Sequence, residues 1–505
     1  MSSGAPKFIG VTQPKSLDYF EESDVMKTVA LVEYLDEVAP LESVEGEHMR
    51  QIVIGLLKRV ANQWCYETAV SLGASEQLAR ETKCAIVTFG SYKLGCLIGP
   101  GSDMDLVCIC PSILTVDAFF GRLVTKLHDL DSVSDVTPIP TAFTPVIKLK
   151  VDGIEIDLLF ARLSTPRLPC DDIESNIGTN DGLLCGIDQR SARALNGPRV
   201  ASMMLELVPN LDTFRTTLRT IKLWAHRRKI YSNVMGYFGG IAWAICVARI
   251  CQLYPNYCPY QLLLKFFEEI RDWPWPYPIQ LNQVEMKDEV EFAYFQVWTS
   301  ASNRGLMPIL TPAFPCQNAS DPVSLTTKRV IIEECKRGAE IIIEHAQDED
   351  ENAIWVKLLE EDAICGDLLA IEISAKSKKI FSRIKGYVQL KLRALVIAIE
   401  RLNIGAELRP YPDLLDANEE GTSACMFVGI KFGRASGEAT VPDLRPAIDK
   451  WMKQVAEWNE RDEFSGMFDV TVDFRSIAEP NNKRSHHNTD LQDENEKKRP
   501  RRDSE

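Results

Sequence analysis

The 505-residue chain has no uninterrupted apolar segment long enough to cross a membrane. Its best candidate, residues 239–246, is short and is soon followed by Arg249. The N-terminus, which begins Met-Ser-Ser-Gly-Ala-Pro-Lys, lacks the apolar core of a secretory signal. These absences predict an intracellular protein with no membrane partner.

The 14 cysteines include no Cys-x-x-Cys pair. This spacing argues against a zinc site and against a disulfide framework, and reduced thiols are expected. Cys108 and Cys110 fall on a predicted core strand, where a thiol behaves as a small apolar group.

Positive charge is also in deficit, because 57 Lys and Arg residues stand against 72 Asp and Glu residues, a formal net charge of −15. Such a balance argues against indiscriminate coating of nucleic acid. It leaves room for a local basic groove, because charges are screened over about 8 Å in cellular salt.

What the chain does contain is a short acidic motif between two predicted strands. Residues 84–89 and 106–110 are short apolar runs, and the eleven residues between Ser91 and Asp103 are rich in glycine, as in a loop. Asp103 and Asp105 open the second strand, and residues two apart project from the same face. Close carboxylates repel one another unless a cation lies between them, and oxygen ligands suit Mg²⁺. The motif therefore predicts a metal site.

A later carboxylate is a candidate third ligand. Residues 145–151 and 154–160 alternate in polarity around Asp152-Gly153, which is a strong signal for a β-hairpin. Asp157 lies on one face of the second arm. It would meet the other two aspartates if the strands are neighbours, which the residues alone do not establish.

The remaining periodicity divides the chain into regions of different character. Apolar spacing predicts helices at about 23–36, 47–65, 116–130, 213–230, 241–254 and 321–345. After residue 355 it predicts strands at 367–374, 425–432 and 467–474 and helices at 383–401 and 444–458, a split βαβ arrangement. Beyond residue 478 the chain is polar, with basic clusters at 483–484 and 497–502. These clusters are typical of a bipartite nuclear import signal, although a solvated charged tail would look the same.

The order of the motifs adds a family resemblance. Phe89-Gly90-Ser91, Asp103-Met104-Asp105 and the later Asp157 resemble the polymerase-β-type nucleotidyltransferase pattern. Asn196-Gly197 and the segments 9–14, 214–228, 231–233, 239–240 and 307–312 are similar to eukaryotic nuclear poly(A) polymerase. The similarity covers nearly the whole chain and is strongest between about residues 84 and 315.

The resemblance implies an α+β fold of three domains. These are a mixed-sheet nucleotidyltransferase domain, a helical middle domain and an RRM-like RNA-binding domain. The boundaries we expect are an N-terminal arm at 1–21 that packs on the middle domain, then 22–209, 210–354 and 355–478, and a disordered basic tail at 479–505.

The resemblance also implies an activity and its partners. The enzyme would add AMP from ATP to the 3′-hydroxyl of mRNA without a template and release pyrophosphate. It would use two Mg²⁺ or Mn²⁺ ions and would act in the nucleus. Its partners would be the RNA 3′ end, cleavage and polyadenylation factors and a nuclear import receptor, and we expect a monomer.

Site residues follow from the same resemblance. Metal binding and catalysis are implied for Asp103, Asp105 and Asp157. Nucleotide binding is implied for these three and for Phe89, Gly90, Ser91, Gly99, Met104, Lys222, Tyr231, Asn233, Gly240 and Ile241, and RNA binding for Phe143, Lys148, Lys150 and Asn196. Taken alone, Gly90-Ser91 would be an ordinary turn. Without the resemblance, a solvated helix face is the less favoured interpretation of Lys222, and a core aromatic at a helix end is as favoured as a binding role for Tyr231.

The sequence departs from the family pattern at two places, and two other functions are alternatives to this one. The loop 95–102 is one residue longer than the family pattern and lacks its histidine, and Phe238 replaces a smaller or aliphatic residue. A terminal uridylyl- or CCA-adding transferase is one alternative, and the surroundings of Tyr231 and Asn233 and the C-terminal domain argue against it. An inactive RNA-binding scaffold is the other, and the intact aspartates argue against it.

Overall fold

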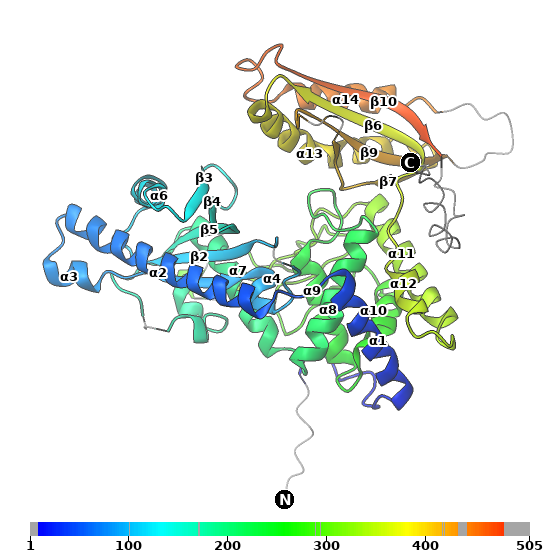
Figure 1. The fold of residues 1–505 in the computed structure, drawn as a ribbon, viewed down its shortest axis with the longest axis horizontal. Coiled ribbons are helices and arrows are strands. Elements are labelled where there is room, and N and C mark those ends of the chain that lie inside the picture. Colours follow the sequence, from blue (N-terminus) through cyan, green and yellow to red (C-terminus); the bar gives the residue numbers. More distant parts are fainter. Residues whose placement is uncertain are drawn as a thin grey trace, which may run out of the picture.

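The structure, a computed structural model, describes residues 9–99, 101–169, 172–287, 289–292, 294–416, 418, 420–432 and 442–478. Three regions follow one another along the chain (Figure 1). We call them the N-terminal sheet region (44–206), the helical region (211–358) and the C-terminal sheet region (366–477). The N-terminal sheet region and the helical region lie side by side, and the C-terminal sheet region lies against the helical region.

The first sheet has five strands in the order β1-β2-β5-β4-β3. Its strands are β1 (Ala85–Phe89), β2 (Met104–Cys110), β3 (Val133–Ile139), β4 (Val146–Val151) and β5 (Ile154–Arg162). Only β2 and β5 run parallel; the other neighbours are antiparallel. The two predicted strands and the hairpin are confirmed. Strand β3 escaped prediction because it is a half-exposed edge strand without an apolar run.

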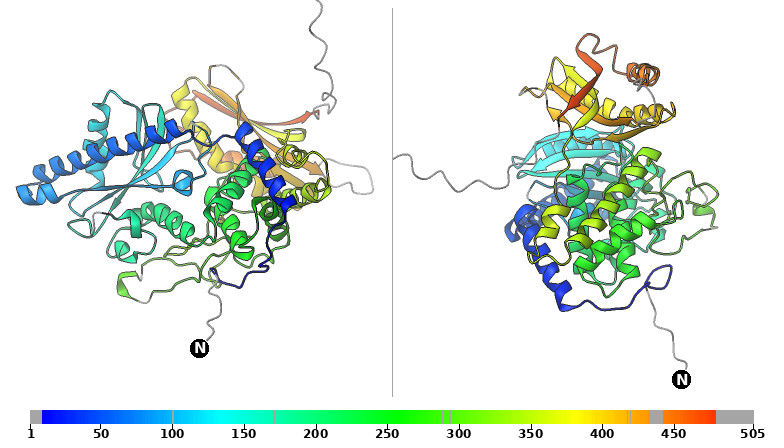
Figure 2. Two further views of the ribbon diagram at one scale, coloured as in Figure 1. Left: turned by 60° about the horizontal axis from the view of Figure 1, so that its bottom comes forward. Right: turned by 90° about the vertical axis from the view of Figure 1, so that its right-hand side faces the viewer.

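Helices cover both faces of this sheet (Figure 2). One core joins α2 (Val44–Ser71) to the sheet around Trp64 and Phe119. The predicted helix at 116–130 consists of α5 (Val116–Ala118), a π-helical turn (Phe119–Leu123) and α6 (Val124–His128). On the opposite face α7 (Gln189–Glu206) contributes Leu195 to a second core. Short helices α3 (Glu76–Glu81) and α4 (Gly90–Leu94) and 3₁₀ turns (Glu174–Asn176, Asp181–Leu184) complete the region.

The helical region is built around one helix that is buried on every side. The helices are α8 (Leu211–Arg227), α9 (Gly240–Leu253), α10 (Pro259–Asp272), α11 (Leu325–Glu344) and α12 (Ala353–Leu358), with a 3₁₀ turn at Val290–Phe292. Nearly all of α9 is buried, as expected of a helix that is apolar all round. No described helix has the length and the apolar character that a membrane crossing requires.

The N-terminal segment packs on the helical region. Helix α1 (Glu22–Val38) lies against α10. The backbone N–H of Lys15 donates to Leu253 O, and the Lys15 ammonium pairs with Glu269 at 2.5 Å. These contacts fix the segment from about residue 10 onward on the helices.

The last region is a five-stranded antiparallel sheet, in which four strands follow the order β10-β6-β9-β7 and the fifth, β8, pairs with β9. Its elements are β6 (Gly366–Ala375), α13 (Lys378–Glu400), β7 (Ala406–Pro410), β9 (Ser423–Phe432), α14 (Arg445–Ala456) and β10 (Phe468–Ile477), with the short β8 (Leu415–Asp416) beside β9. This is the predicted split βαβ arrangement. The predicted basic import signal lies outside the described residues.

Candidate active site

Three carboxylates converge where β2 and β5 run side by side. The parallel register places Asp105 directly beside Asp157, and Asp103 immediately precedes β2. One carboxylate oxygen of each aspartate lies within 4.8 Å of one from each of the others. The parallel pairing of β2 with β5 thus brings Asp157 to the first two aspartates. The sequence alone did not establish that these two strands are neighbours.

The triad is electrostatically strained without a cation. Burial, followed by the charges of Asp103 and Asp157, raises the pKa of Asp105 from 3.8 to about 7. The ammonium of Lys148 on β4 pairs with both carboxylate oxygens of Asp157, at 2.7 and 2.8 Å. The three carboxylates offer oxygen ligands around one point, and burial together with their mutual repulsion raises the pKa of Asp105 toward neutral pH. A divalent cation would bind these oxygens and offset the repulsion.

The raised pKa predicts a pH-dependent stability. Between pH 3.8 and about 7 the folded Asp105 binds more protons than the unfolded one, so the free energy of unfolding falls as pH rises. Between about pH 6 and pH 8, we expect the free energy of unfolding of the metal-free wild type to fall by about 1 kcal/mol more than that of Asp105→Asn. Chemical unfolding in chelator at both pH values measures this difference. Saturating Mg²⁺ should reduce it, whereas identical pH dependence of the two proteins would contradict the prediction.

The turn after β1 brings the backbone close to the triad. Gly90 has a φ of +64°, and a Cβ added there would collide with Asp105 Oδ2. Phe89 precedes α4, and a Cβ on Gly197 of α7 would lie 2.7 Å from the Phe89 ring. Ser91 follows in the first turn of α4. Glycine is therefore required at position 90 for two independent reasons, conformation and space.

The enlarged loop is anchored to the connection between α1 and α2. Ile98 forms a β-bridge with Leu41, and the N–H of Gly99 donates to Pro40 O at 2.9 Å. A Cβ on Gly99 would meet no atom within 4 Å, although its φ is +68°. Gly99 is thus held by the α1–α2 connection, and no contact with the triad is seen for it.

The helical region supplies the facing wall. Lys222 on α8 donates to Cys96 O at 3.5 Å, and its charge contributes to the electrostatics of Asp105. Tyr231 stacks on His226, with ring centroids 3.9 Å apart. Burial, and after it electrostatic interaction with Cys96, Asp103 and Asp105, raises the pKa of Tyr231 to about 12, so its hydroxyl keeps its proton.

The start of α9 is shaped by the same tyrosine. A Cβ on Gly240 would collide with the Tyr231 hydroxyl, and Ile241 follows as a half-buried residue. Asn233 is exposed and has its Cβ against Gly239. Tyr231, Asn233 and the α9 start therefore form one contiguous surface. Met104, in contrast, is fully buried under the triad.

Of the four residues predicted to bind RNA, only Lys148 contacts one of the three aspartates. Lys148 reaches the triad, whereas Lys150 pairs with Glu155 at 3.0 Å, further toward the hairpin turn. Phe143 is 78% exposed. Asn196 on α7 has a buried Oδ1 without a hydrogen-bond partner among the described residues.

Two contributors were missed from the sequence. His226 was seen only as part of a polar helix face, yet it supports Tyr231. Arg193, whose guanidinium lies 4.0 Å from the Phe143 ring centroid, was not predicted at all. The spacing of Arg193 and Asn196, three apart on one helix, was the available signal.

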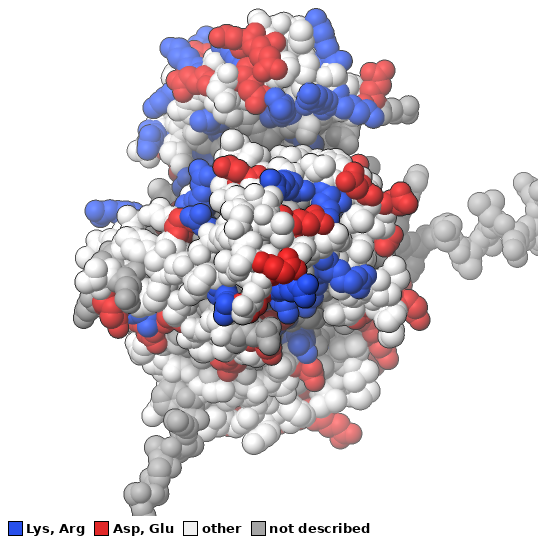
Figure 3. All heavy atoms as spheres, turned by 90° about the vertical axis from the view of Figure 1, so that its left-hand side faces the viewer, with Lys and Arg blue, Asp and Glu red and all other residues white. Residues whose placement is uncertain are grey.

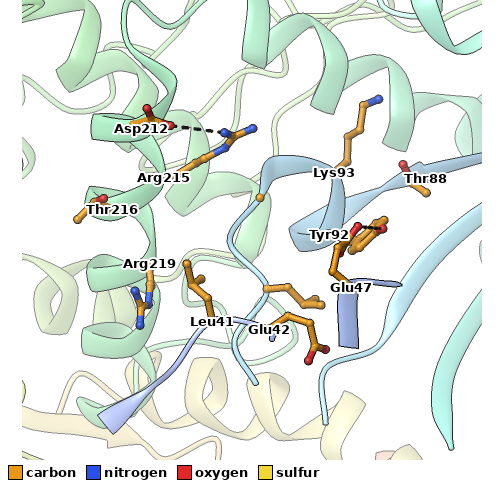
Figure 4. Close-up of a pocket in the computed structure, with 12 residues that line it drawn as sticks. Leu41, Glu42, Glu47, Thr88, Tyr92, Lys93, Asp212, Arg215, Thr216 and Arg219 are labelled. Atoms are coloured by element: carbon orange, nitrogen blue, oxygen red, sulfur yellow. Dashed lines mark hydrogen bonds and ion pairs between the residues drawn. The ribbon is translucent and has the colours of Figure 1, made fainter. Parts of the chain in front are cut away.

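A separate cavity of about 640 Å³ lies between α4 and α8 (Figure 4). Tyr92 and Lys93 line it from α4, and Arg215 and Arg219 line it from α8. None of the three aspartates lines it. The N-terminal sheet region and the helical region are thus incompletely packed against each other behind the turn at Gly90 and Ser91.

The family is shown by two matches that together span most of the chain. The poly(A) polymerase nucleotidyltransferase domain matches residues 10–208. The poly(A) polymerase central domain matches residues 213–361. The chain belongs to the poly(A) polymerase family.

Curated relatives extend this poly(A) polymerase likeness beyond residue 361. Nuclear poly(A) polymerase 4 of Arabidopsis thaliana is 36% identical over 464 residues, covering 89% of this chain and 61% of the relative. Poly(A) polymerase of Dictyostelium discoideum is 34% identical over 485 residues, covering 94% of this chain and 59% of the relative. The chain thus spans about three fifths of the length of these relatives.

Among solved structures, the RNA terminal uridylyl transferase Cid1 matches this poly(A) polymerase family member at 14% sequence identity. The TM-score is 0.45, and the match covers 68% of this chain and 100% of that chain.

Proposed function

We propose that the protein is a template-independent polynucleotide adenylyltransferase. It would transfer AMP from ATP to the 3′-hydroxyl of RNA and release pyrophosphate. The observation that carries the proposal is the convergence of Asp103, Asp105 and Asp157, two of which lie close enough to Tyr231 to raise its pKa. Family membership supports it.

The chemistry assigns a task to each group. Two divalent ions, Mg²⁺ or Mn²⁺, would activate the attacking oxygen and neutralise the leaving pyrophosphate. Asp103 and Asp105 would hold both ions, and Asp157 would hold chiefly the one at the 3′-hydroxyl. Gly90 and Ser91 would offer backbone N–H groups and a hydroxyl to the triphosphate. Lys222 would neutralise phosphate charge from the facing wall.

Adenine recognition falls to the surface beside α9. Tyr231 is held by His226 and retains its proton, so it can stack or donate a hydrogen bond. Asn233 carries both a donor and an acceptor, which the edge of adenine requires. A site built for hydrogen bonds disfavours a base that presents the reverse pattern, because the bound base would cover Asn233 and leave its amide without partners.

Nucleotide selection gives the direct test. On an oligo(A) primer with Mg²⁺ or Mn²⁺, we expect kcat/KM for ATP to exceed that for UTP by about a hundredfold. Asn233→Ala should reduce this ratio, and Val234→Ala, an exposed neighbour, should not. Equal use of ATP and UTP by the wild type would refute the adenylyl assignment. No extension with any nucleotide would favour the inactive scaffold.

The wider assignments are part of the same proposal. We assign 22–209 to nucleotidyl transfer, 210–354 to the middle domain and 355–478 to an RRM-like RNA-binding domain. Lys and Arg side chains border the indentation beneath the C-terminal sheet region, where they would attract RNA phosphates (Figure 3). The naming of relatives as nuclear enzymes supports action in the nucleus. Cleavage and polyadenylation factors are part of the proposal as partners there.

A further inference from the structure

A second cavity opens at the far end of β5. Its volume is about 570 Å³, and it is lined by the end of β5, by Pro145 before β4 and by the starts of α5 and α7. The cavity exists because β4 begins too late to cover β5 fully. Val146, the first residue of β4, pairs with Leu159, so Phe160 and Arg162 lie beyond the ladder between these two strands.

Three guanidinium groups line this cavity, which we call the arginine pocket: Arg162, Arg190 and Arg193. Arg162 lies 4.0 Å from Asp188. Arg190 and Arg193 have no ion pair and no side-chain hydrogen bond within the part of the chain that the structure describes. The Nε of Arg193 is buried without a hydrogen-bond partner.

The acidic groups of the pocket neutralise these arginines only in part, since Asp188 pairs with Arg162 alone. Asp188 caps α7: its Oδ1 accepts from the N–H groups of Arg190 and Ser191, and its Oδ2 accepts from the Ser191 hydroxyl. Asp117, the other carboxylate, lies in the first turn of α5. Three cations against two anions leave the arginine pocket positive, with two guanidinium groups available to an anion.

The arginine pocket is joined to the active site by an aromatic contact. Arg193 lies over the exposed ring of Phe143, at 4.0 Å from its centroid. Phe143 stands five residues before Lys148, which pairs with Asp157. Along β5, Arg162 lies five residues after Asp157, a separation of about 16 Å, and projects from the opposite face of the strand, so the path from the triad to the arginine pocket runs past Phe143 and Arg193. That span accommodates a few nucleotides of single-stranded RNA.

We propose that the arginine pocket binds backbone phosphates of the RNA primer, upstream of the nucleotide that stacks on Phe143. The inference rests on the proposed function, since it takes the RNA 3′ end to lie at Asp157. Guanidinium groups bind phosphate in a bidentate manner, and an aromatic ring beside a basic groove is the usual combination for single strands. If the arginine pocket binds upstream phosphates, a primer long enough to reach it should bind more tightly than a shorter one.

The test measures RNA binding directly. Arg190→Ala and Arg190→Ala/Arg193→Ala would be titrated with 3′-deoxy oligo(A) of about two nucleotides, too short to reach the arginine pocket, and of about fifteen nucleotides, by fluorescence anisotropy. For the double variant we expect Kd for the long primer to rise about fivefold to tenfold, and that for the short primer to change by less than about twofold. The slope of log Kd against log salt should fall by about 0.7 per lost phosphate contact. Oligo(U) should show the same ratio, because phosphate contacts carry no sequence information.

Matched controls keep the outcome decisive. Arg80→Ala removes an exposed arginine of the same region that pairs with Glu76, and it should leave both affinities unchanged. The single Arg190→Ala variant removes only an exposed side chain and should fold normally. A loss of RNA affinity in this variant would therefore not be due to misfolding. Unchanged RNA affinity at both lengths, or equal loss at both, would overturn the proposal. If the double variant lost affinity for polyglutamate while its RNA affinity stayed unchanged, the arginine pocket would be assigned to an acidic peptide instead. Because binding needs no turnover, an inactive wild type that still shows the length effect would refute only the adenylyl transfer.

Discussion

Replacing Asp157 with asparagine is expected to lower kcat for primer extension by at least about a thousandfold while leaving the protein folded. The substitution keeps the shape of the side chain but removes one of the three negative charges that surround the cation position. Steady-state extension of oligo(A) with saturating ATP and Mg²⁺ measures the loss.

The same substitution should not destabilise the metal-free protein, which separates a catalytic loss from misfolding. The charge of Asp157 is one of the causes that raise the pKa of Asp105, so its removal relieves repulsion within the triad. We therefore expect metal-free Asp157→Asn to melt no earlier than the wild type, and Mg²⁺ to raise its melting temperature less.

The control for Asp157 lies two residues away on the same face of β5. Glu155 is exposed and pairs with Lys150 at 3.0 Å, so Glu155→Gln changes the same charge without reaching the triad. Its activity should stay within about twofold of the wild type, as expected for an exposed pair. Full activity of Asp157→Asn would remove Asp157 from the metal site.

The acidic pair could be predicted from the sequence because it depends only on local geometry. Asp103 and Asp105 are two residues apart at the start of a strand, and a strand places such residues on one face. Asp157 was different. Its hairpin was evident from Asp152-Gly153, but its position beside Asp105 depends on β5 pairing with β2 in parallel, across a long connection. Long-range pairing leaves no trace in the residues of either strand.

The elements that escaped prediction have different causes. Helix α10 carries apolar residues at helical spacing, including Leu263, Phe267 and Ile270, and this signal was overlooked. Helix α7 is buried largely through small residues and contains Pro198, so its periodicity is weak. The route of the loop 95–102 is fixed by contacts with Pro40 and Leu41, far away in sequence.

The arginine pocket illustrates the same limit at the level of charge. Arg162 ends a strand, and Arg190 and Arg193 begin a helix that follows a long irregular segment. Nothing in the net charge of −15 indicates that these three cations meet. Only the offset between the ends of β4 and β5 brings them to one opening.

A buried ion network links the active-site wall to the C-terminal sheet region. Glu334 on α11 accepts two hydrogen bonds from Arg228, at 2.8 and 3.1 Å, and one from Arg409 of β7 at 2.9 Å. Asp362 pairs with the same two arginines at 3.0 and 2.7 Å. Burial raises the pKa of Glu334, but the hydrogen bond from Arg228 and the charges of both arginines outweigh it and hold the pKa below its usual value.

Replacing Glu334 with alanine is expected to cost about 3 kcal/mol of stability, because Arg228 and Arg409 would lose one of their two shared carboxylates and keep only Asp362. Chemical unfolding and thermal melting at neutral pH measure the loss. The neighbouring Glu333 is the matched control, since it pairs with Arg329 on the exposed side of the same helix. Glu333→Ala should cost less than about 1 kcal/mol.

The sign of the pH dependence tests the same network. Because the pKa of Glu334 is lowered in the folded state, its contribution is present above the unfolded pKa of 4.5 and is lost as pH falls through the folded pKa. The difference between wild type and Glu334→Ala should therefore shrink in acid. Arg228 directly follows α8, the helix that carries Lys222, so loosening the network should also raise KM for ATP. If Glu334→Ala unfolds like Glu333→Ala, the network does not hold these two regions together.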